Sequence, residues 1–402
     1  MKDNRVLEIT DDIKWIGVLD YDIVTFDVVM ETEYGTTYNS YLIDAEKKAV
    51  IDTVKEKFGD EYFAKLRSQV NPAEIDYIIA LHTEPDHSGN IRNLLDIAPR
   101  AVVVASGNAI RYLKDMIGPE FPHIVIKDGQ TLDLGNRTLR FIGASNLHWP
   151  DTMYAYLEQE KILFTCDSFG CHFCHEDMFD DEVGNFDDAF MYYFNVILKP
   201  FGKHMLRAID KIRGLKIKAV CPGHGPILRS DWKKYVDLSE HYSSEALKLQ
   251  EKHRVYIPYV SAYHKTGILA EKIAEGIRQS GTVEVDIQDI EKTPIGEMDE
   301  RVARASAIIV GSPTINQNIL MPVYKLFSVI SPLRDHGKLA GAFGSYGWSG
   351  ENKTMLMTNL VNLKLKYFRE GVFVKFTPDS QEIEKCIEYG KAFGEALLGI
   401  ES

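Results

Sequence analysis

Short apolar runs alternate with polar turns over about the first 250 residues, a pattern typical of β-sheets. The segment 25–54 predicts two long strands around a turn at 33–36, and the pairs Gly135-Asn136 and Gln159-Glu160 predict hairpin turns. Shorter strands are predicted at 77–81, 101–105, 139–144, 161–165 and 218–221. Amphipathic spacing predicts helices over 58–70, 187–212 and 231–252. This mixture indicates sheets covered by helices, with antiparallel hairpins present.

After residue 252 strands and helices alternate regularly. Strands are expected at 255–260, 283–287, 307–310, 339–343 and 373–374. Helices are expected at 267–279, 321–330, 352–363 and 379–398. Such alternation predicts right-handed βαβ units and a doubly wound parallel sheet. The sequence therefore predicts two α/β domains, 1–252 and 253–402, that meet near His253.

Composition and charge narrow the class of protein. The 402 residues suffice for about two to three domains, and 45% hydrophobic with 26% charged residues is an ordinary globular balance. The formal net charge of −13 argues against a nucleic-acid partner. The N-terminus has no signal-peptide pattern, and no run approaches the roughly 20 apolar residues of a membrane span. Five cysteines without framework spacing favour a reducing cytoplasm.

Two imidazoles and two carboxylates lie within six residues, directly after the predicted strand at 77–81. They are His82, Glu84, Asp86 and His87. If the backbone stays extended, positions 82, 84 and 86 face one side, and Ser88-Gly89 then allows a helix to begin. Such a cluster is costly inside a protein unless it holds cations.

Three further candidates also follow predicted strands: His148, Asp167 and His224. Four strand ends can therefore converge on one rim. Two divalent cations carry +4 and the three carboxylates −3, and the remaining charge suits a bridging hydroxide. The set has only nitrogen and oxygen donors, which argues against a structural zinc site and favours a two-metal site.

The order His-x-Glu-x-Asp-His, followed by His, Asp and His, resembles the metallo-β-lactamase fold. The hydrolases of that superfamily usually show His-x-His-x-Asp-His and bind zinc, whereas here Glu84 replaces the middle histidine. A carboxylate in this place hardens the site and favours iron, which is the mark of the flavodiiron (A-type flavoprotein) family. The resemblance implies that His82, Glu84 and His148 hold one iron. It implies that Asp86, His87 and His224 hold a second, with Asp167 as the bridge.

Three segments of the second domain follow predicted strands, where doubly wound sheets bind ligands. The first opens a helix and offers hydroxyl and backbone N–H groups to a phosphate, and the other two suit a flat ring. Together they resemble flavodoxin, which binds FMN. The candidate residues are Ser261, Tyr263, His264, Lys265, Thr266, Gly267, Pro313, Thr314, Ile315, Asn316, Ser345, Tyr346, Gly347, Trp348, Ser349 and Gly350. His264 and Lys265 replace residues that are usually smaller in the family, and Lys265 offers an added phosphate contact.

The resemblance covers about residues 5–398 and implies a metallo-β-lactamase-like αββα sandwich followed by a flavodoxin-like domain. It implies reduction of O2 to water or of NO to N2O at a non-haem diiron centre, with electrons passing through FMN. Flavin and irons together store the four electrons that O2 needs. It further implies an external donor, rubredoxin or reduced deazaflavin, because no Cys-x-x-Cys pair follows the second domain. The implied assembly is a head-to-tail homodimer, or a dimer of such dimers.

The sequence predicts the roles of the residues around the metal cluster less specifically. His172 and Tyr193 are candidates for steering protons, since the family often has a histidine at the first position. Asp27 stands where many relatives have a histidine near the irons, and Trp149 is expected to shape the pocket. Cys171 and Cys174 form a Cys-x-x-Cys pair whose default reading is buried neutral thiols, with a metal or a redox role as the alternatives.

Two alternative functions stay open at this point. A dinuclear zinc hydrolase with an appended flavodoxin domain would use the same first fold, although Glu84 argues against it. A plain electron carrier, with the first domain as a scaffold, is a second alternative.

Overall fold

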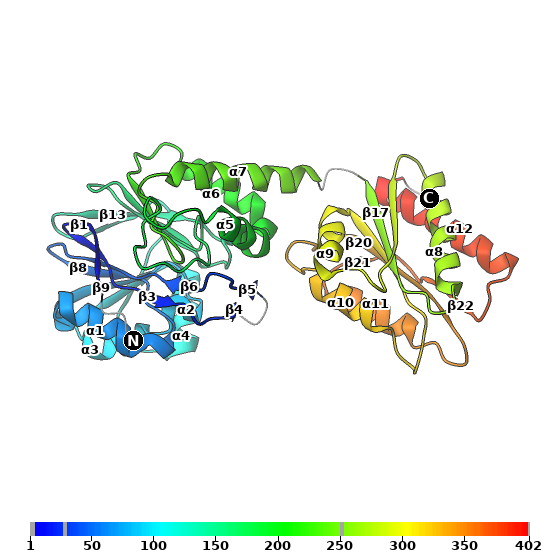
Figure 1. Cartoon of the computed structure of the whole chain (residues 1–402), viewed down its shortest axis with the longest axis horizontal. Coiled ribbons are helices and arrows are strands. Elements are labelled where there is room, and N and C mark those ends of the chain that lie inside the picture. The colour runs from blue at the N-terminus through cyan, green and yellow to red at the C-terminus, as the bar shows by residue number, and fades with distance from the viewer. Residues whose placement is uncertain (1–4, 27–29, 250–252, 401–402) are drawn as a thin grey trace. The chain divides into compact units, whose positions relative to one another are not determined.

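The computed structural model describes residues 5–26, 30–249 and 253–400. The chain forms two compact units, Met1–Ser244 and Glu245–Ser402 (Figure 1). The boundary expected at 252/253 adjoins residues 250–252, and Asp27 also lies outside the described residues. Among the helices that the structure describes, none combines the length and apolar character that a membrane crossing requires.

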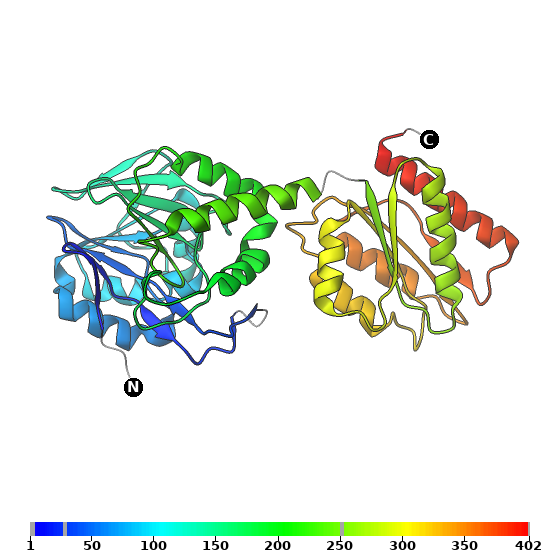
Figure 2. The same cartoon turned by 45° about the horizontal axis from the view of Figure 1, so that its top comes forward.

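The first unit is built on two main sheets (Figures 1 and 2). The larger sheet has the order β1 (Leu7–Thr10), β2 (Ile13–Trp15), β7 (Tyr41–Ile43), β8 (Lys48–Ile51), β9 (Ile75–Ala80), β10 (Val102–Ala105), β11 (His123–Val125). The smaller has the order β12 (Thr131–Asp133), β13 (Thr138–Gly143), β14 (Met153–Leu157), β15 (Ile162–Cys166), β16 (Ala219–Pro222). Short two-stranded pairs join β3 (Val18–Asp20) to β6 (Thr36–Tyr38) and β4 (Thr25–Phe26) to β5 (Met30–Glu31).

Strand alternation explains why the two sheets pack face to face. In β7, Tyr41 and Ile43 enter the core between the sheets, while Leu42 points to the helical side. In β8, Ala49 and Ile51 do the same, because successive side chains leave opposite faces of a strand. The outer faces are covered by α1 (Gly59–Gln69), α3 (Ile91–Ile97) and α4 (Gly107–Ile117) on one side, and by α6 (Gly202–Ile212) and α7 (Trp232–Leu249) on the other (Figure 1). The predicted αββα sandwich is confirmed.

Two predictions of local structure are wrong. The helix expected over 187–212 is divided into α5 (Asp187–Tyr193), a π-turn at Phe194–Leu198, a 3₁₀ turn at Lys199–Phe201 and α6. Pro200 explains the break, because proline has no N–H for the helical ladder. The two long strands expected over 25–54 are five short ones, β4 to β8, since the chain moves between separate sheets there.

The second unit is a parallel sheet with helices on both faces (Figure 1). Its order is β18 (Glu284–Asp289), β17 (Arg254–Tyr259), β19 (Ala307–Gly311), β20 (Leu339–Tyr346), β21 (Lys366–Tyr367), and β22 (Val372–Lys375) also pairs with β20. Residues of α8 (Lys265–Gln279) and α12 (Ser380–Leu398) join the core on one face. The other face packs α9 (Ile295–Arg304), α10 (Met321–Val329) and α11 (Asn352–Asn362). The predicted doubly wound fold is confirmed.

Candidate functional site

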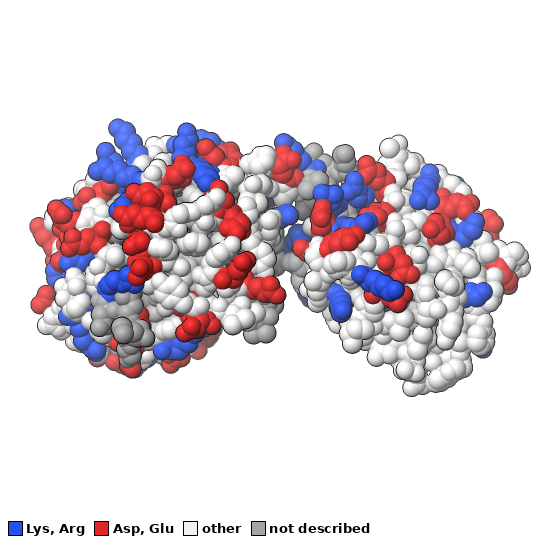
Figure 3. Space-filling view, in the orientation of Figure 1, with Lys and Arg blue, Asp and Glu red and all other residues white. Residues whose placement is uncertain are grey.

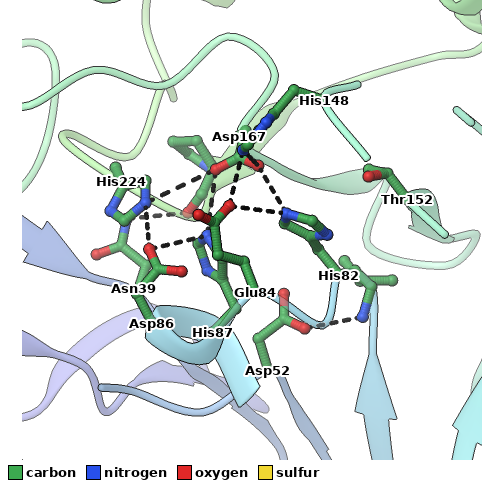
Figure 4. Close-up of polar contacts among 12 residues, drawn as sticks. Asn39, Asp52, His82, Glu84, Asp86, His87, His148, Thr152, Asp167 and His224 are labelled. Atoms are coloured by element: carbon green, nitrogen blue, oxygen red, sulfur yellow. Dashed lines mark hydrogen bonds and ion pairs between the residues drawn. The ribbon is translucent and has the colours of Figure 1, made fainter. Parts of the chain in front are cut away.

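All seven predicted metal ligands meet at one rim of the first unit (Figure 4). His82 and Glu84 follow β9, and His148 lies in the loop between β13 and β14. Asp167 directly follows β15, and His224 lies just beyond β16. The remaining two ligands, Asp86 and His87, sit on the short helix α2 (Pro85–Ser88). Four strand ends thus supply the cluster.

The local backbone of the cluster differs from the expected extended run. The helical turn α2 begins at Pro85 and ends at Ser88, so Asp86 and His87 do not alternate with Glu84 along a strand. Proline is favoured at the first position of a helix because its missing N–H would have no partner there. The turn places Asp86 and His87 in one group of ligands and places Glu84, at its N-terminal boundary, in another group.

The first group of ligand atoms gathers around Glu84. Its Oε2 lies 2.8 Å from His148 Nε2 and 3.2 Å from His82 Nε2. In the second group, Asp86 Oδ2 lies 3.0 Å from His224 Nε2 and 3.4 Å from His87 Nε2. Atoms that share one transition-metal ion at about 2.0–2.2 Å lie roughly 3–3.5 Å apart, so both groups have the spacing of ligands to a common ion.

Asp167 faces both groups with different oxygens. Its Oδ2 lies 3.5 Å from His82 Nε2 and 3.7 Å from His148 Nε2. Its Oδ1 lies 3.1 Å from His87 Nε2 and 3.7 Å from His224 Nε2. One carboxylate therefore spans the two groups, as a bridging ligand would.

Hydrogen bonds to the far side of the rings fix their orientation. His82 Nδ1 bonds to Asp151 Oδ2 at 3.3 Å, and Asp151 Oδ2 also accepts from the N–H and the hydroxyl of Thr83, each at 2.8 Å. His224 Nδ1 donates to the carbonyl of Thr37 at 2.6 Å. Both rings therefore turn Nε2 toward the cluster, the usual arrangement around metal-binding histidines.

Asn39 holds the loop that carries His224 (Figure 4). Its side-chain amide donates to the carbonyls of Pro222 and Gly225 at 2.9 and 3.0 Å. Its Oδ1 accepts from Trp15 Nε1 and from Thr37 Oγ1, both at 2.9 Å. Sequence reasoning missed this residue, because a polar side chain between two strands carries no signal of its partners.

Burial and close opposite charges perturb the cluster strongly. Burial alone would raise the pKa of Asp167, but His87 and His82 lie so close that the pKa falls well below its usual value. Burial alone would lower the pKa of His82, yet its bonds to Asp151 and Glu84 raise it well above the usual value. In the absence of cations, protons on imidazole must offset three buried carboxylates. This competition is what metal ions relieve.

A further observation also indicates that these residues fit a pair of metal ions. Asp86 Oδ1 and Asp167 Oδ2 are buried and accept no hydrogen bond from the described residues. Buried carboxylate oxygens without partners are costly in a protein interior. A donor set of four imidazoles and three carboxylates suits iron ions better than a set rich in thiolates would.

A third group of potential ligands surrounds the opposite edge of His87: Asp52 and Cys166. Because Nε2 of His87 already faces Asp86 and Asp167, these two groups lie behind the ring. Burial raises the pKa of Asp52 to about 7 and that of the Cys166 thiol well above its usual value. Neither forms a hydrogen bond to His87 Nδ1, which has no partner among the described residues, and both belong to the surroundings of the cluster.

His172 and Tyr193 lie beside the second group. The Tyr193 hydroxyl donates to Asp167 Oδ1 at 3.1 Å. His172 bonds through Nδ1 to Thr36 Oγ1 at 2.8 Å, and its ring lies 5.1 Å from that of His224. Burial and the nearby His224 lower the pKa of His172 well below its usual value, so the ring is neutral.

Other predicted side chains are placed more simply. The Trp149 ring meets the His82 ring edge-on at 5.1 Å, which fits its expected role in shaping the pocket. All five cysteines are buried, and none of them forms a disulfide. Cys171 and Cys174 belong to none of the potential metal-binding groups among the described residues. Both observations agree with the default interpretation of Cys171 and Cys174 as neutral buried thiols.

A cavity of about 300 Å³ opens in the second unit at the ends of β17, β19 and β20. All three predicted loops contribute to it, with these residues in its lining: Tyr263, Lys265, Pro313, Thr314, Ile315, Ser345, Tyr346 and Gly347. Lys265 begins α8, where free backbone N–H groups favour an anion. A phosphate subsite and an apolar, aromatic chamber therefore adjoin, which fits a flavin mononucleotide.

The other predicted FMN residues lie outside the lining: Ser261, His264, Thr266, Gly267, Asn316, Trp348, Ser349 and Gly350. Some of them shape the loops. Ser261 Oγ accepts from the N–H of Gly267 at 3.0 Å, and Thr266 Oγ1 bonds to Ser345 Oγ at 2.9 Å. Trp348 is 77% exposed and remains available to a ligand.

Sequence reasoning missed a fourth segment of the cavity. Phe376 and Thr377 line it from the end of β22. The signal was present, because ligands of doubly wound sheets collect at the carboxyl ends of strands and 373–374 was predicted as one. The flavodoxin resemblance itself rests on the three loops and does not extend to this strand end.

The fold and the two sites define a two-domain oxidoreductase with a two-metal centre and a flavin. Residues 36–225 match the family model described as ODP family beta lactamase, and residues 257–390 match that of flavodoxin. The chain is 38% identical to flavo-diiron protein FprA2 of Clostridium acetobutylicum, covering 97% of this chain and 99% of the relative. It is 34% identical to a nitric oxide reductase of Moorella thermoacetica, over 96% and 98%.

A solved structure agrees with these relatives. The rubredoxin oxygen:oxidoreductase of the anaerobe Desulfovibrio gigas superposes with a TM-score of 0.70 at 29% identity, covering 98% of this chain and 99% of that one. The chain belongs to the flavodiiron (type A flavoprotein) family. Its cofactors are accordingly FMN and a diiron centre, and the zinc hydrolase alternative is not supported.

Proposed function

We propose that the protein reduces O2 to water, NO to N2O, or both, at the two-metal centre of its first domain. The observation that carries this proposal is the bridging position of Asp167, with one oxygen toward each group of ligands. Two irons held side by side by these residues would supply a joint binding place for a small diatomic molecule and the electrons for its reduction. Names of relatives, a nitric oxide reductase and a rubredoxin oxygen:oxidoreductase, support both substrates.

We assign the ligands by their spacing. One iron would be held by His82, Glu84 and His148, and the other by Asp86, His87 and His224, with Asp167 shared between them. Five of the seven are buried, and the side chains of Glu84 and His148 are only 14% and 18% exposed, which keeps bulk water away from the reacting molecule.

Proton supply is proposed to involve Tyr193 and His172. The Tyr193 hydroxyl already donates to Asp167, so it can hold a proton beside the reacting molecule. His172 keeps a buried Nε2 that has no hydrogen-bond partner among the described residues. A neutral imidazole in this position can accept or return a proton.

Electrons are proposed to enter through FMN in the second domain from an external donor, rubredoxin or reduced deazaflavin. The name of the Desulfovibrio gigas structure supports a rubredoxin-type donor. A head-to-tail homodimer, alone or paired into a dimer of dimers, would bring the FMN of one chain to the irons of its partner. Five buried cysteines without a disulfide support a location in the reducing cytoplasm, and the net charge of −13 argues against a nucleic-acid partner.

Anaerobic reduction followed by mixing with O2 or NO tests the proposal. The wild-type protein should reoxidise rapidly, whereas Asp167→Ala should slow reoxidation at least about 100-fold while FMN stays bound. Asp177→Ala is the matched control, because its side chain is 51% exposed and pairs only with His175 among the described residues. Equal turnover in Asp167→Ala and wild type would refute the assignment of this centre as the site of reduction.

A further inference from the structure

Phe376 has an unusual position for a large apolar side chain. It is 63% exposed, yet it lines the cavity assigned to FMN together with Tyr346 and Gly347. Its backbone φ is 59°, in the left-handed region that bulky residues rarely adopt. An exposed aromatic residue held in an unfavourable backbone conformation calls for a function at that place.

The backbone of Phe376 is fixed to the third FMN loop. Its N–H donates to the carbonyl of Tyr346 at 2.7 Å, and β22 directly before it is paired with β20. This bond continues the pairing of β22 beyond Lys375, so the position of Phe376 follows that of Tyr346. The ring therefore sits on a rigid support rather than on a loose loop.

Gly347 makes room for the ring of Phe376. A Cβ placed on Gly347 would come within 3.3 Å of Phe376 Cε1 and 3.8 Å of Cζ. The absence of a side chain on Gly347 lets the ring lie beside the third loop and reach the cavity. A phenyl ring has no hydrogen bond to give to phosphate or ribityl hydroxyls, so what it offers the ligand is an apolar surface.

No other ring in the described chain covers Phe376. The ring–ring contacts among described residues do not include it, and the nearest charged group over its face is Lys375 Nζ, 5.8 Å from the centroid. Aromatic surfaces of this size are normally buried against a partner. The partner that fits a cavity lined by Tyr346, Pro313 and Ile315 is a flat aromatic ligand.

We propose that Phe376 packs against the isoalloxazine ring of FMN and forms a fourth contact segment of the flavin site, which neither the three loops nor the family resemblance supplies. The proposal rests on the assignment of FMN to this cavity. Thr377, the next residue in the lining, extends the same segment with a hydroxyl. The C-terminal end of β22 therefore takes part in cofactor binding alongside those of β17, β19 and β20.

Titration of FMN into the full-length apoprotein tests this contact, with quenching of flavin fluorescence as the readout. Phe376→Ala should raise the Kd for FMN about 3- to 10-fold, the range expected for one aromatic contact. Phe376→Tyr should keep the wild-type Kd, because it retains the ring. Leu333→Ala should also keep it, since Leu333 is 67% exposed and lies outside the cavity lining.

Phe376→Gly separates the ring from the backbone. Glycine accepts a positive φ without strain, so this variant should unfold at the same temperature as Phe376→Ala or higher, while its Kd for FMN rises as in Phe376→Ala. Wild-type affinity in both Phe376→Ala and Phe376→Gly would overturn the proposal while leaving FMN binding by the protein intact. Failure of the wild-type apoprotein to bind FMN would instead overturn the assignment of the cavity itself.

Discussion

Replacing Asn39 by alanine should both destabilise the protein and loosen one of its two metals. The side chain is 1% exposed and makes four hydrogen bonds, two of them to the loop that carries His224. In the other two bonds, Asn39 Oδ1 accepts from Trp15 Nε1 and from Thr37 Oγ1. Thr37 in turn accepts the ring N–H of His224 through its carbonyl.

The magnitude follows from these bonds. At a net value of about 1 kcal/mol each, the four bonds contribute about 4 kcal/mol to the free energy of unfolding. Loss of groups that orient a metal ligand typically weakens metal binding about 10- to 100-fold. The loss should concern the ion held by Asp86, His87 and His224, because Asn39 supports only that group.

Two measurements on one preparation check this expectation. Urea unfolding followed by circular dichroism gives the free energy, and metal analysis after mild chelation gives the number of ions retained per chain. Asn93→Ala is the control, since Asn93 is exposed and its side chain donates to a single partner, Asn90 Oδ1. Unchanged stability of Asn39→Ala, or equal loss of both metals, would refute the role given to this network.

Three further predictions address other parts of the chain. Asp335→Asn should lower the free energy of unfolding by about 3–5 kcal/mol, because Asp335 is fully buried and pairs with Lys338 and Arg334 at 2.7 and 2.9 Å. Urea denaturation against the exposed control Asp210→Asn measures this, and a difference below about 1 kcal/mol would contradict it. Lys265→Ala should weaken FMN but not riboflavin, which lacks the phosphate, and equal weakening of both by fluorescence titration would argue against a phosphate contact. Removal of metals by a chelator should lower the thermal midpoint, since bound ligands stabilise the native state and the buried carboxylates lose their partners, and calorimetry before and after reloading should show a reversible shift.

The convergence of the seven candidate ligands could be predicted because it depends on topology. His82, Asp167 and His224 all follow strands, and strand ends of layered α/β folds meet at one rim. The chemistry of the ligand set also follows from residue type alone. What joins Glu84 to one group and Asp86 to the other is the helical turn at Pro85, which the extended pattern did not predict.

The supports of the site could not be predicted from the sequence. Asn39 reaches Pro222, far along the chain, only because of the way the two sheets pack. Phe376 enters the flavin cavity because β22 pairs with β20 in one particular register. Register and packing depend on the whole hydrophobic core rather than on local spacing, so short motifs carry no record of them.

Membership of the family accounts for the two cofactors, whereas the geometry shows which residues of a site are ligands and which residues orient those ligands. Asp151 and Thr37 orient the rings of His82 and His224 from outside the cluster. Residues that orient a metal ligand in this way are expected to affect metal affinity and activity almost as much as the ligands themselves.

Mössbauer spectroscopy of protein loaded with ⁵⁷Fe tests the central claim most directly. A centre built from two separate groups and one shared Asp167 predicts two iron ions per chain, magnetically coupled in the oxidised state, with coupling lost in Asp167→Ala. One iron per chain, two uncoupled irons, or a protein that takes up zinc and rejects iron would contradict the account.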